Sequence, residues 1–266
     1  ESVPPRHGHE FRSTTRGGAP PAALRVAQLS PSPRDRVRLL VASKRMAPEL
    51  GLAETLEAHY AEALAWCRTA QDPYLEGRVT EALAIQRGRA GEVVEARTLF
   101  DRTVQLFKAA GHETHLSMVF INSSILYRRQ GEIESASVEA QRALRAAQRA
   151  GNRKLEAISL IVISNICIIR SQLDEAFDLR TRALPIMEEV GDRRSMGKTY
   201  GDLGNLHAER MEIEEAHKYY DKALRIARSI GDRHSEALWT GALANLALQL
   251  GQNARARDLH RDALTL

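Results

Sequence analysis

The stretch GDLGNLHAERMEIEEAHKYYDKALRIARSIGD, residues 201–232, decides the fold of this chain. Its closing glycine and the polar residue that follows belong to a series with a period of 40 residues, formed by Gly111, Gly151, Gly191 and Gly231. A second series with the same period lies halfway between, at Gly51, Gly91, Gly131 and Gly251. Ser171 and Met211 fill its two remaining places. Two series at one period indicate an internal repeat.

Two columns of small side chains keep the same period. One column consists of the alanines Ala96, Ala136, Ala176, Ala216 and Ala256. The other consists of Ala84, Ser124, Ser164, Gly204 and Ala244. Small residues at fixed places in every unit let neighbouring helices approach closely, so the repeats are expected to stack on one another.

Each unit of the sequence predicts two helices. In the unit that begins at Gly191, this glycine can end the preceding helix in the left-handed conformation. Asp192 can cap the next helix, because its carboxylate accepts from free backbone N–H groups. We expect a first helix from about Ser195 to Glu209 and a second from about Glu214 to Ser229, the latter with apolar residues at helical spacing.

These columns resemble those of tetratricopeptide repeats, whose pattern is matched in one unit by Leu203, Gly204, Ala216, Tyr220 and Ala223. The usual unit of that family has about 34 residues. The longer unit found here resembles the repeats of cell-polarity adaptors and of bacterial STAND-class ATPase regulators. The resemblance covers about residues 35–266 and implies an all-α fold, a right-handed α-solenoid of helix-turn-helix repeats.

The sequence predicts two regions. Residues 1–30 are rich in proline and glycine and are expected to be a disordered basic linker. Residues 31–266 are expected to form an array of about six units: 31–70 (degenerate), 71–110, 111–150, 151–190, 191–230 and 231–266 (truncated). Because no polar capping helix follows the last unit, we expect the parent chain to continue.

The positive charge of the chain is concentrated near its N-terminus. Residues 1–50 contain nine lysines and arginines and four acidic residues. Their net charge of +5 (9 − 4) exceeds the net charge of the whole chain, which is +4. The rest of the chain is therefore near neutral and is not expected to bind nucleic acid. The basic segment itself is a solvated linker, a contact for nucleic acid or acidic lipid, or a tail that folds into the groove of the array.

Several classes of protein are disfavoured by the sequence. Cys67 and Cys167 lie in apolar helical patterns and are expected to be small buried residues, which fits a reducing, cytoplasmic compartment. The most apolar run, residues 157–169, is too short to span a bilayer. Gly197-Lys198-Thr199 resembles the end of a phosphate-binding loop but opens a helix. We expect no catalytic set, no metal site and no cofactor, so an enzyme is the least favoured class.

The resemblance implies that the first helices line a concave groove, with one column of inner residues that reads Ile85, Ile125, Asn165, Asn205 and Asn245. An asparagine side chain offers both a donor and an acceptor, which suits the backbone of a bound peptide. The three asparagines either bind a ligand in this way or bond the neighbouring repeat and fix the stacking.

Other inner residues predict a groove that changes along its length. Its middle is apolar and includes Ile125, Ile161 and Ile168, which either form an exposed binding patch or are buried against each other. Arg128 is either a solvated residue or part of an anion site. Towards the C-terminus the groove becomes polar, with Lys198 and Asp202.

Three hypotheses of function follow. The first is a scaffold or regulatory module that binds a peptide or helix from a partner protein, or from another domain of the parent chain. The second is a sensor of a signalling peptide or a small molecule. The third is a regulator that contacts nucleic acid through the basic N-terminal segment. The sequence identifies neither the partner nor the oligomeric state.

Overall fold

The computed structural model describes residues 32–43 and 53–266, which are helical apart from short turns. It divides into two compact units, residues 1–71 and residues 72–266. The described part of the first unit consists of α2 (Pro33–Ser43) and α3 (Ala53–Thr69), which pack against each other. The linker predicted for residues 1–30 lies outside the described residues.

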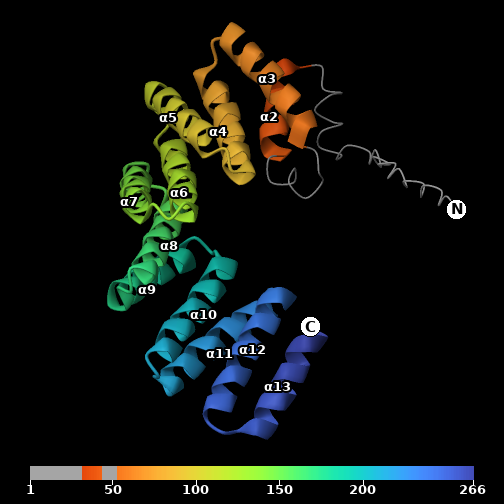
Figure 1. The fold of residues 1–266 in the computed structure, drawn as a ribbon, viewed down its shortest axis with the longest axis vertical. Helices are drawn as coiled ribbons and strands as arrows, with labels where there is room; N and C mark the ends of the chain where they lie inside the picture. The colour runs from red at the N-terminus through yellow and green to blue at the C-terminus, as the bar shows by residue number, and fades with distance from the viewer. Residues whose placement is uncertain (1–31, 44–52) are drawn as a thin grey trace, which may run out of the picture. The chain divides into compact units, whose positions relative to one another are not determined.

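The second unit consists of ten helices that pack in chain order (Figure 1). They are α4 (Pro73–Ala90), α5 (Val93–Ala109), α6 (Glu113–Arg129), α7 (Ile133–Arg149), α8 (Arg153–Ile169), α9 (Leu173–Glu189), α10 (Arg193–Glu209), α11 (Ile213–Ser229), α12 (Arg233–Gln249) and α13 (Asn253–Thr265). Each helix contacts the next one, so the unit is an α-solenoid of helical hairpins, as the sequence predicted.

The helices end where the two glycine series predicted. Gly111 and Gly191 have left-handed φ values of 70° and 68°. Ser171 and Met211, which replace glycine in the second series, have φ values of 59° and 61°. The repeat therefore imposes one backbone conformation on this position, even where a side chain makes that conformation costly.

Replacing Met211 by glycine is expected to stabilise the protein by about 0.5–1 kcal/mol, because glycine adopts the left-handed conformation without strain. The Met211 side chain is 71% exposed, so little burial is lost. The matched control is Gly131→Ala, at φ 78°, which is expected to destabilise by about 1 kcal/mol. Urea unfolding followed by circular dichroism measures both changes, and two shifts of the same sign would contradict the explanation.

The first helices of four repeats begin at capping side chains. Oδ1 of Asp72, Asn152, Asp192 and Asp232 accepts the backbone N–H of the third residue beyond it, at 3.0, 3.0, 3.1 and 3.2 Å respectively. The cap predicted at Asp192 is therefore present. α10 begins at Arg193, two residues before the predicted start, because the residue after a cap is already helical.

The small columns bring the two helices of each repeat together. Ala136 and Ala176 are fully buried, and their carbonyl oxygens accept hydrogen bonds from Ser124 Oγ and Ser164 Oγ at 2.8 and 3.0 Å. These bonds satisfy buried hydroxyl groups where a larger side chain would separate the helices. The columns thus let the helices approach closely, as expected, and they are part of the core.

Both cysteines are buried, as their apolar surroundings predicted. Loss of solvation on burial raises the pKa of the Cys167 thiol, which favours its neutral form. Among the described helices, none combines the length and the apolar character needed to cross a membrane.

Candidate functional site

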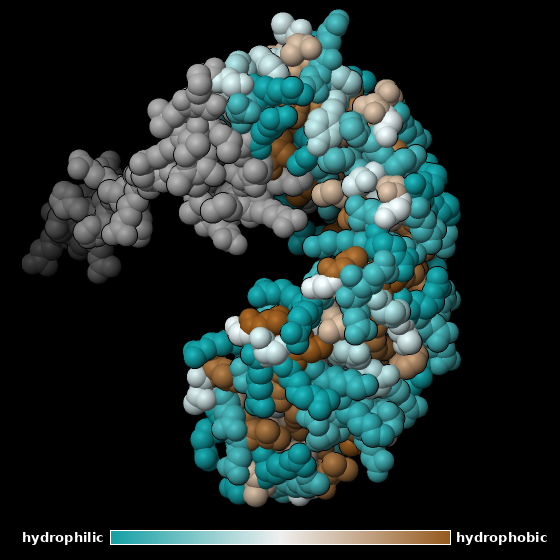
Figure 2. Space-filling view, turned by 180° about the vertical axis from the view of Figure 1, so that it is seen from behind, coloured by the Kyte–Doolittle hydropathy of each residue, from teal (hydrophilic) through white to brown (hydrophobic). Residues whose placement is uncertain are grey.

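A groove lies between α8 and α10, within the second unit. The first helices of the other neighbouring repeats, α4 with α6, α6 with α8 and α10 with α12, pack against each other, whereas α8 and α10 make fewer contacts. The space between them has a volume of about 580 Å³. Figure 2 shows that apolar residues form patches in a mostly polar surface, and several residues of this groove are apolar.

One wall of the groove is an apolar face of α8. It consists of Ile158, Ile161, Val162, Ile168 and Ile169. Val162 is buried, whereas Ile161 and Ile168 are partly exposed and Ile169 is 48% exposed. Part of the apolar middle is therefore buried and part of it is exposed. The wall as a whole still leaves apolar surface in contact with solvent.

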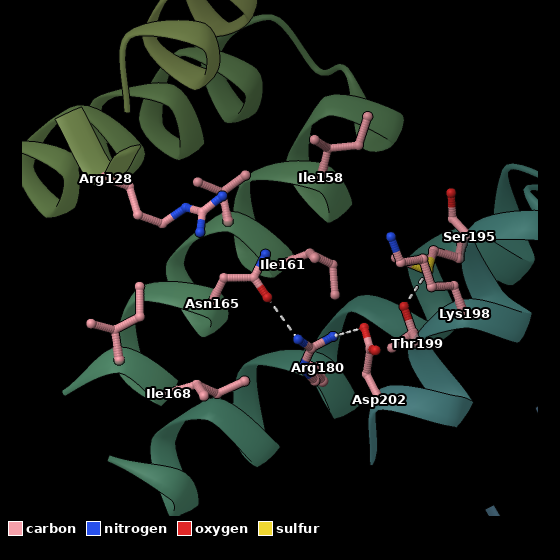
Figure 3. A pocket seen from close by; sticks show the side chains of 13 residues that line it. Arg128, Ile158, Ile161, Asn165, Ile168, Arg180, Ser195, Lys198, Thr199 and Asp202 are labelled. Carbon is pink, nitrogen blue, oxygen red and sulfur yellow. Dashed lines mark hydrogen bonds and ion pairs between the residues drawn. The ribbon is translucent and has the colours of Figure 1, made fainter. Parts of the chain in front are cut away.

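The floor of the groove is a buried polar cluster centred on Arg180 of α9. Nη1 of Arg180 donates to Oδ2 of Asp202 at 2.6 Å, and Nη2 donates to Oδ1 of Asn165 at 2.7 Å (Figure 3). Arg180 is 3% exposed. In the preceding repeat the same position is Ala140, so a long side chain replaces a methyl group where α8 and α10 stay apart.

The hydrogen bond from Arg180 fixes the orientation of the Asn165 amide. A guanidinium only donates, so Oδ1 must face it and the Nδ2 amino group must face away. Figure 3 shows Nδ2 of Asn165 directed away from Arg180. Asn205 is oriented in the same way, because Oη of Tyr220, also 15 residues further along the chain, donates to its Oδ1 at 2.7 Å.

The oxygen atoms of two of the three asparagines are used in bonds within the repeat. Oδ1 of Asn165 and of Asn205 serves the structure, in bonds to the second helix of the same repeat rather than to the neighbouring repeat. The amino group of each remains a donor. In the described residues, Asn245 has no corresponding bond. His260 stands 15 residues after it, at the position that Arg180 and Tyr220 occupy in the two preceding repeats.

Tyr220 stays protonated over the physiological range. Desolvation, with smaller contributions from Glu209 and Asp202, raises its pKa from 10.0 to about 12. The hydroxyl is therefore a reliable donor to Asn205. Because the folded pKa lies above the unfolded one, the stability contributed by neutral Tyr220 is complete below pH 10 and is lost as the pH rises towards 12.

We expect the free energy of unfolding of the parent protein to fall by about 2 kcal/mol more than that of Tyr220→Phe between these two pH values. Urea titrations of both proteins at a series of alkaline pH values measure the difference. Equal losses in the two proteins would show that Tyr220 ionises normally in the folded state.

Two further cations reach the groove from the helices on either side of α8. Arg128 belongs to α6 and Lys198 to α10, and both line the groove (Figure 3). Within the described residues, neither side chain forms an ion pair or a hydrogen bond. Lys198 lies inside a continuous helix together with Gly197 and Thr199, so this segment is not a phosphate-binding loop.

The structure brings together six of the nine residues that the sequence predicted for binding. Those that line the groove are Arg128, Ile161, Asn165, Ile168, Lys198 and Asp202. Those that do not are Ile125, Asn205 and Asn245. Ile125 is partly buried on α6 against the core, and the other two lie further along the solenoid, on α10 and α12. The sequence did not predict Arg180, whose only signal was a charge in the column that otherwise holds Phe100, Ala140, Tyr220 and His260.

The architecture and the repeat geometry define a helical-repeat protein with a groove on its first helices. The family model of the tetratricopeptide repeat matches residues 155–229 and 195–266. Residues 155–266 therefore carry tetratricopeptide repeats, and the helical hairpins before residue 155 continue the same solenoid. No curated protein sequence matches the chain.

Several solved structures share this fold. BtubC from P. vanneervenii is 20% identical with a TM-score of 0.65, and the match covers 79% of this chain and 87% of that one. The apo form of RapI is 14% identical with a TM-score of 0.71, over 90% of this chain and 67% of that one. A STAND protein with a tetratricopeptide repeat sensor, from Pyrococcus horikoshii, is 16% identical with a TM-score of 0.73. That match covers 91% of this chain but 38% of the STAND protein. At these identities the comparison shows the fold alone.

Proposed function

We propose that this chain is a protein-interaction module that holds a segment of another polypeptide in the groove between α8 and α10. The observation that carries the proposal is the orientation of Asn165. Its Oδ1 is held by Arg180, so its amino group is a fixed donor beside the apolar wall of α8. A polypeptide supplies both complements, carbonyl oxygens for the donor and apolar side chains for the wall.

The size of the groove is suited to a short segment. Ligand sites in proteins usually have volumes of about 300–1,000 Å³, and a groove of about 580 Å³ lies within that range. Because Arg180 joins Asn165 on α8 to Asp202 on α10, the floor is held by bonds between three helices. A floor of this kind is ordered before a ligand arrives, which lowers the entropic cost of binding.

A sensor of a short signalling peptide is the second candidate function. One structure with this fold is a Rap protein complexed with Competence and Sporulation Factor, at 10% identity and a TM-score of 0.64. The STAND protein carries its repeats as a sensor within a longer chain. These proteins support two sources for the occupant of the groove, a free peptide or another domain of a parent chain.

The remaining hypotheses have weaker support. Contact with nucleic acid depends on residues 1–50, most of which lie outside the described residues, and we do not propose it. Aspartyl phosphate phosphatase F from Bacillus subtilis has the same fold, at 13% identity and a TM-score of 0.66. The proposal of a non-catalytic module therefore rests on the groove and not on the fold.

Photo-crosslinking from inside the groove tests the proposal. A benzophenone amino acid replaces Ile169, which lines the groove and is 48% exposed. The matched control carries it in place of Val138, an apolar residue of α7 that is 55% exposed and does not line the groove. After irradiation in cells of the source organism, we expect a polypeptide adduct at position 169 that is missing at position 138.

The mass of the adduct separates the two sources of the ligand. An increase in mass equal to a few residues identifies a short peptide, and an increase equal to a whole protein identifies a scaffold partner. Identical adducts at both positions, or no adduct at position 169, would contradict binding in this groove.

A further inference from the structure

The charges around the groove do not balance within the chain. Its lining contains three cations, Arg128, Arg180 and Lys198, and one anion, Asp202. The buried pair of Arg180 with Asp202, at 2.6 Å, neutralises the floor. Two positive charges therefore remain, on Arg128 and Lys198, one on each side of the apolar wall.

Elsewhere in the solenoid, many arginines pair with an acidic residue nearly one repeat length away in the sequence, either within the same repeat or in the adjacent one. Four such pairs join residues 36 positions apart: Arg149 with Glu113, Arg153 with Glu189, Arg170 with Glu134, and Arg210 with Asp174. Arg128 and Lys198 form no such pair in the part of the chain that the structure describes. Their charges remain available to a bound molecule, and the apolar wall between them limits solvent screening once it is covered.

The apolar wall restricts what that molecule can be. Four isoleucines and a valine of α8 face the groove, and covering them is favourable only for an occupant with apolar side chains. A nucleic-acid backbone would satisfy the two cations but not this wall. The wall and the cations together fit an acidic polypeptide better than any other polyanion.

The basic N-terminal stretch is a poor occupant on the same grounds. Residues 1–50 contain nine basic and four acidic residues, so they carry the same sign of charge as the groove. Like charges brought together oppose binding. The tail that folds into the groove, one of the interpretations of this stretch, is therefore disfavoured.

Resting on the proposed function, we infer that the groove selects an acidic segment of polypeptide, in which apolar side chains that cover α8 are flanked by Asp or Glu residues. One carboxylate pairs with Arg128 and another with Lys198. The amino group of Asn165 donates to a backbone carbonyl between them. The apolar contacts supply affinity, and the two ion pairs supply the preference for acidic sequences.

Selection from a phage-displayed library of random peptides tests this inference. The bait is the full chain, compared with the double variant Arg128→Glu/Lys198→Glu. Lys108→Glu/Arg145→Glu is the matched control, because it reverses two exposed charges outside the groove. All three proteins are first required to melt at the same temperature. The best selected peptide is then synthesised with a fluorescent label, and its Kd is measured by anisotropy.

We expect the selected peptides to be enriched in Asp and Glu together with apolar residues. The Kd is expected to rise roughly tenfold or more in the groove variant and to stay unchanged in the control. Added salt should weaken binding to the parent protein.

The other outcomes are distinct. Apolar peptides without acidic enrichment, whose binding is lost in Ile161→Asp, would overturn the acidic preference and leave the proposed function standing. If no peptide is enriched on the parent protein relative to the Ile161→Asp variant, both the acidic preference and the proposed function are wrong. If a labelled single-stranded oligonucleotide binds more tightly than the peptides and loses binding in the groove variant, the occupant is a nucleic acid and the inference is wrong.

Discussion

Replacing Gly201 by alanine is expected to destabilise the protein by about 2 kcal/mol, through overpacking. A Cβ atom at this position of α10 would lie 2.2 Å from Cζ2 of Trp239 on α12. The indole is 3% exposed and stacks on the ring of Tyr220, with 6.1 Å between the ring centroids. The alanine can be accommodated only if the two first helices separate, and the lost contacts outweigh the higher helix propensity of alanine.

The next repeat provides the control for this change. Gly241 occupies the same column, and a Cβ atom there would meet no other atom within 4 Å. Gly241→Ala is therefore expected to stabilise the protein by about 0.5–1 kcal/mol. The same substitution at equivalent positions of two repeats thus has opposite signs.

Urea unfolding followed by circular dichroism measures both variants. A second comparison uses Trp239→Phe, which removes the ring atoms nearest to Gly201. In that background, Gly201→Ala should cost clearly less than in the parent protein. Equal costs in the two backgrounds, or a Gly201→Ala variant as stable as the parent, would refute overpacking against Trp239.

The 40-residue period made the helices of the second unit predictable, because each boundary has a local chemical cause. Glycine favours the left-handed turn and Asp192 caps the following helix, so both features are visible in a single unit. Periodicity also identified Ser171 and Met211 as members of a glycine column, and they share its backbone conformation.

The floor of the groove was not predictable in this way. Arg180 stands where the preceding repeat has Ala140, and its guanidinium bonds side chains of both α8 and α10. In the sequence, Arg180 looks like an ordinary charge on an amphipathic helix. Its burial depends on Asp202 and Asn165, which are 22 and 15 residues away and lie on two other helices. A column pattern compares equivalent residues of different repeats and contains no information on such cross-contacts.

The orientation of the asparagines was hidden for the same reason. An amide at the position of Asn165 or Asn205 is consistent with either a ligand contact or a structural bond. The partner that fixes Oδ1 is a guanidinium in one repeat and a phenol in the next. Only the three-dimensional arrangement shows that the guanidinium and the phenol each donate to Oδ1. In both repeats the amino group of the asparagine is left available.

Asp202→Ala is expected to destabilise the protein by about 3 kcal/mol, because it leaves the guanidinium of Arg180 buried without an anion. Arg180 is 3% exposed, whereas the side chain of Asp202 is 23% exposed. The charge that remains after Asp202→Ala therefore cannot reach water, while the one that remains after Arg180→Met can. We expect Arg180→Met to cost about 1–2 kcal/mol, the net contribution of the two hydrogen bonds that it removes, to Asp202 and Asn165.

The double variant Arg180→Met/Asp202→Ala is expected to recover most of the loss, to within about 1 kcal/mol of the parent protein, because no unpaired buried charge is left. The free energies from urea unfolding of the four proteins form a double-mutant cycle. Strict additivity of the two single changes would show that the two side chains do not interact as the geometry requires.

The same double variant separates stability from binding. It removes the donor that orients Asn165 but leaves the apolar wall, Arg128 and Lys198 in place. If the amino group of Asn165 binds a ligand carbonyl, a folded double variant should hold the groove-bound peptide more weakly than the parent does, because the amide is free to turn. Asn165→Ala in the double-variant background should then have little further effect on the Kd. If the double variant instead binds as tightly as the parent protein, the bond from Arg180 serves only the packing of the helices, and recognition depends on the wall and the two outer cations.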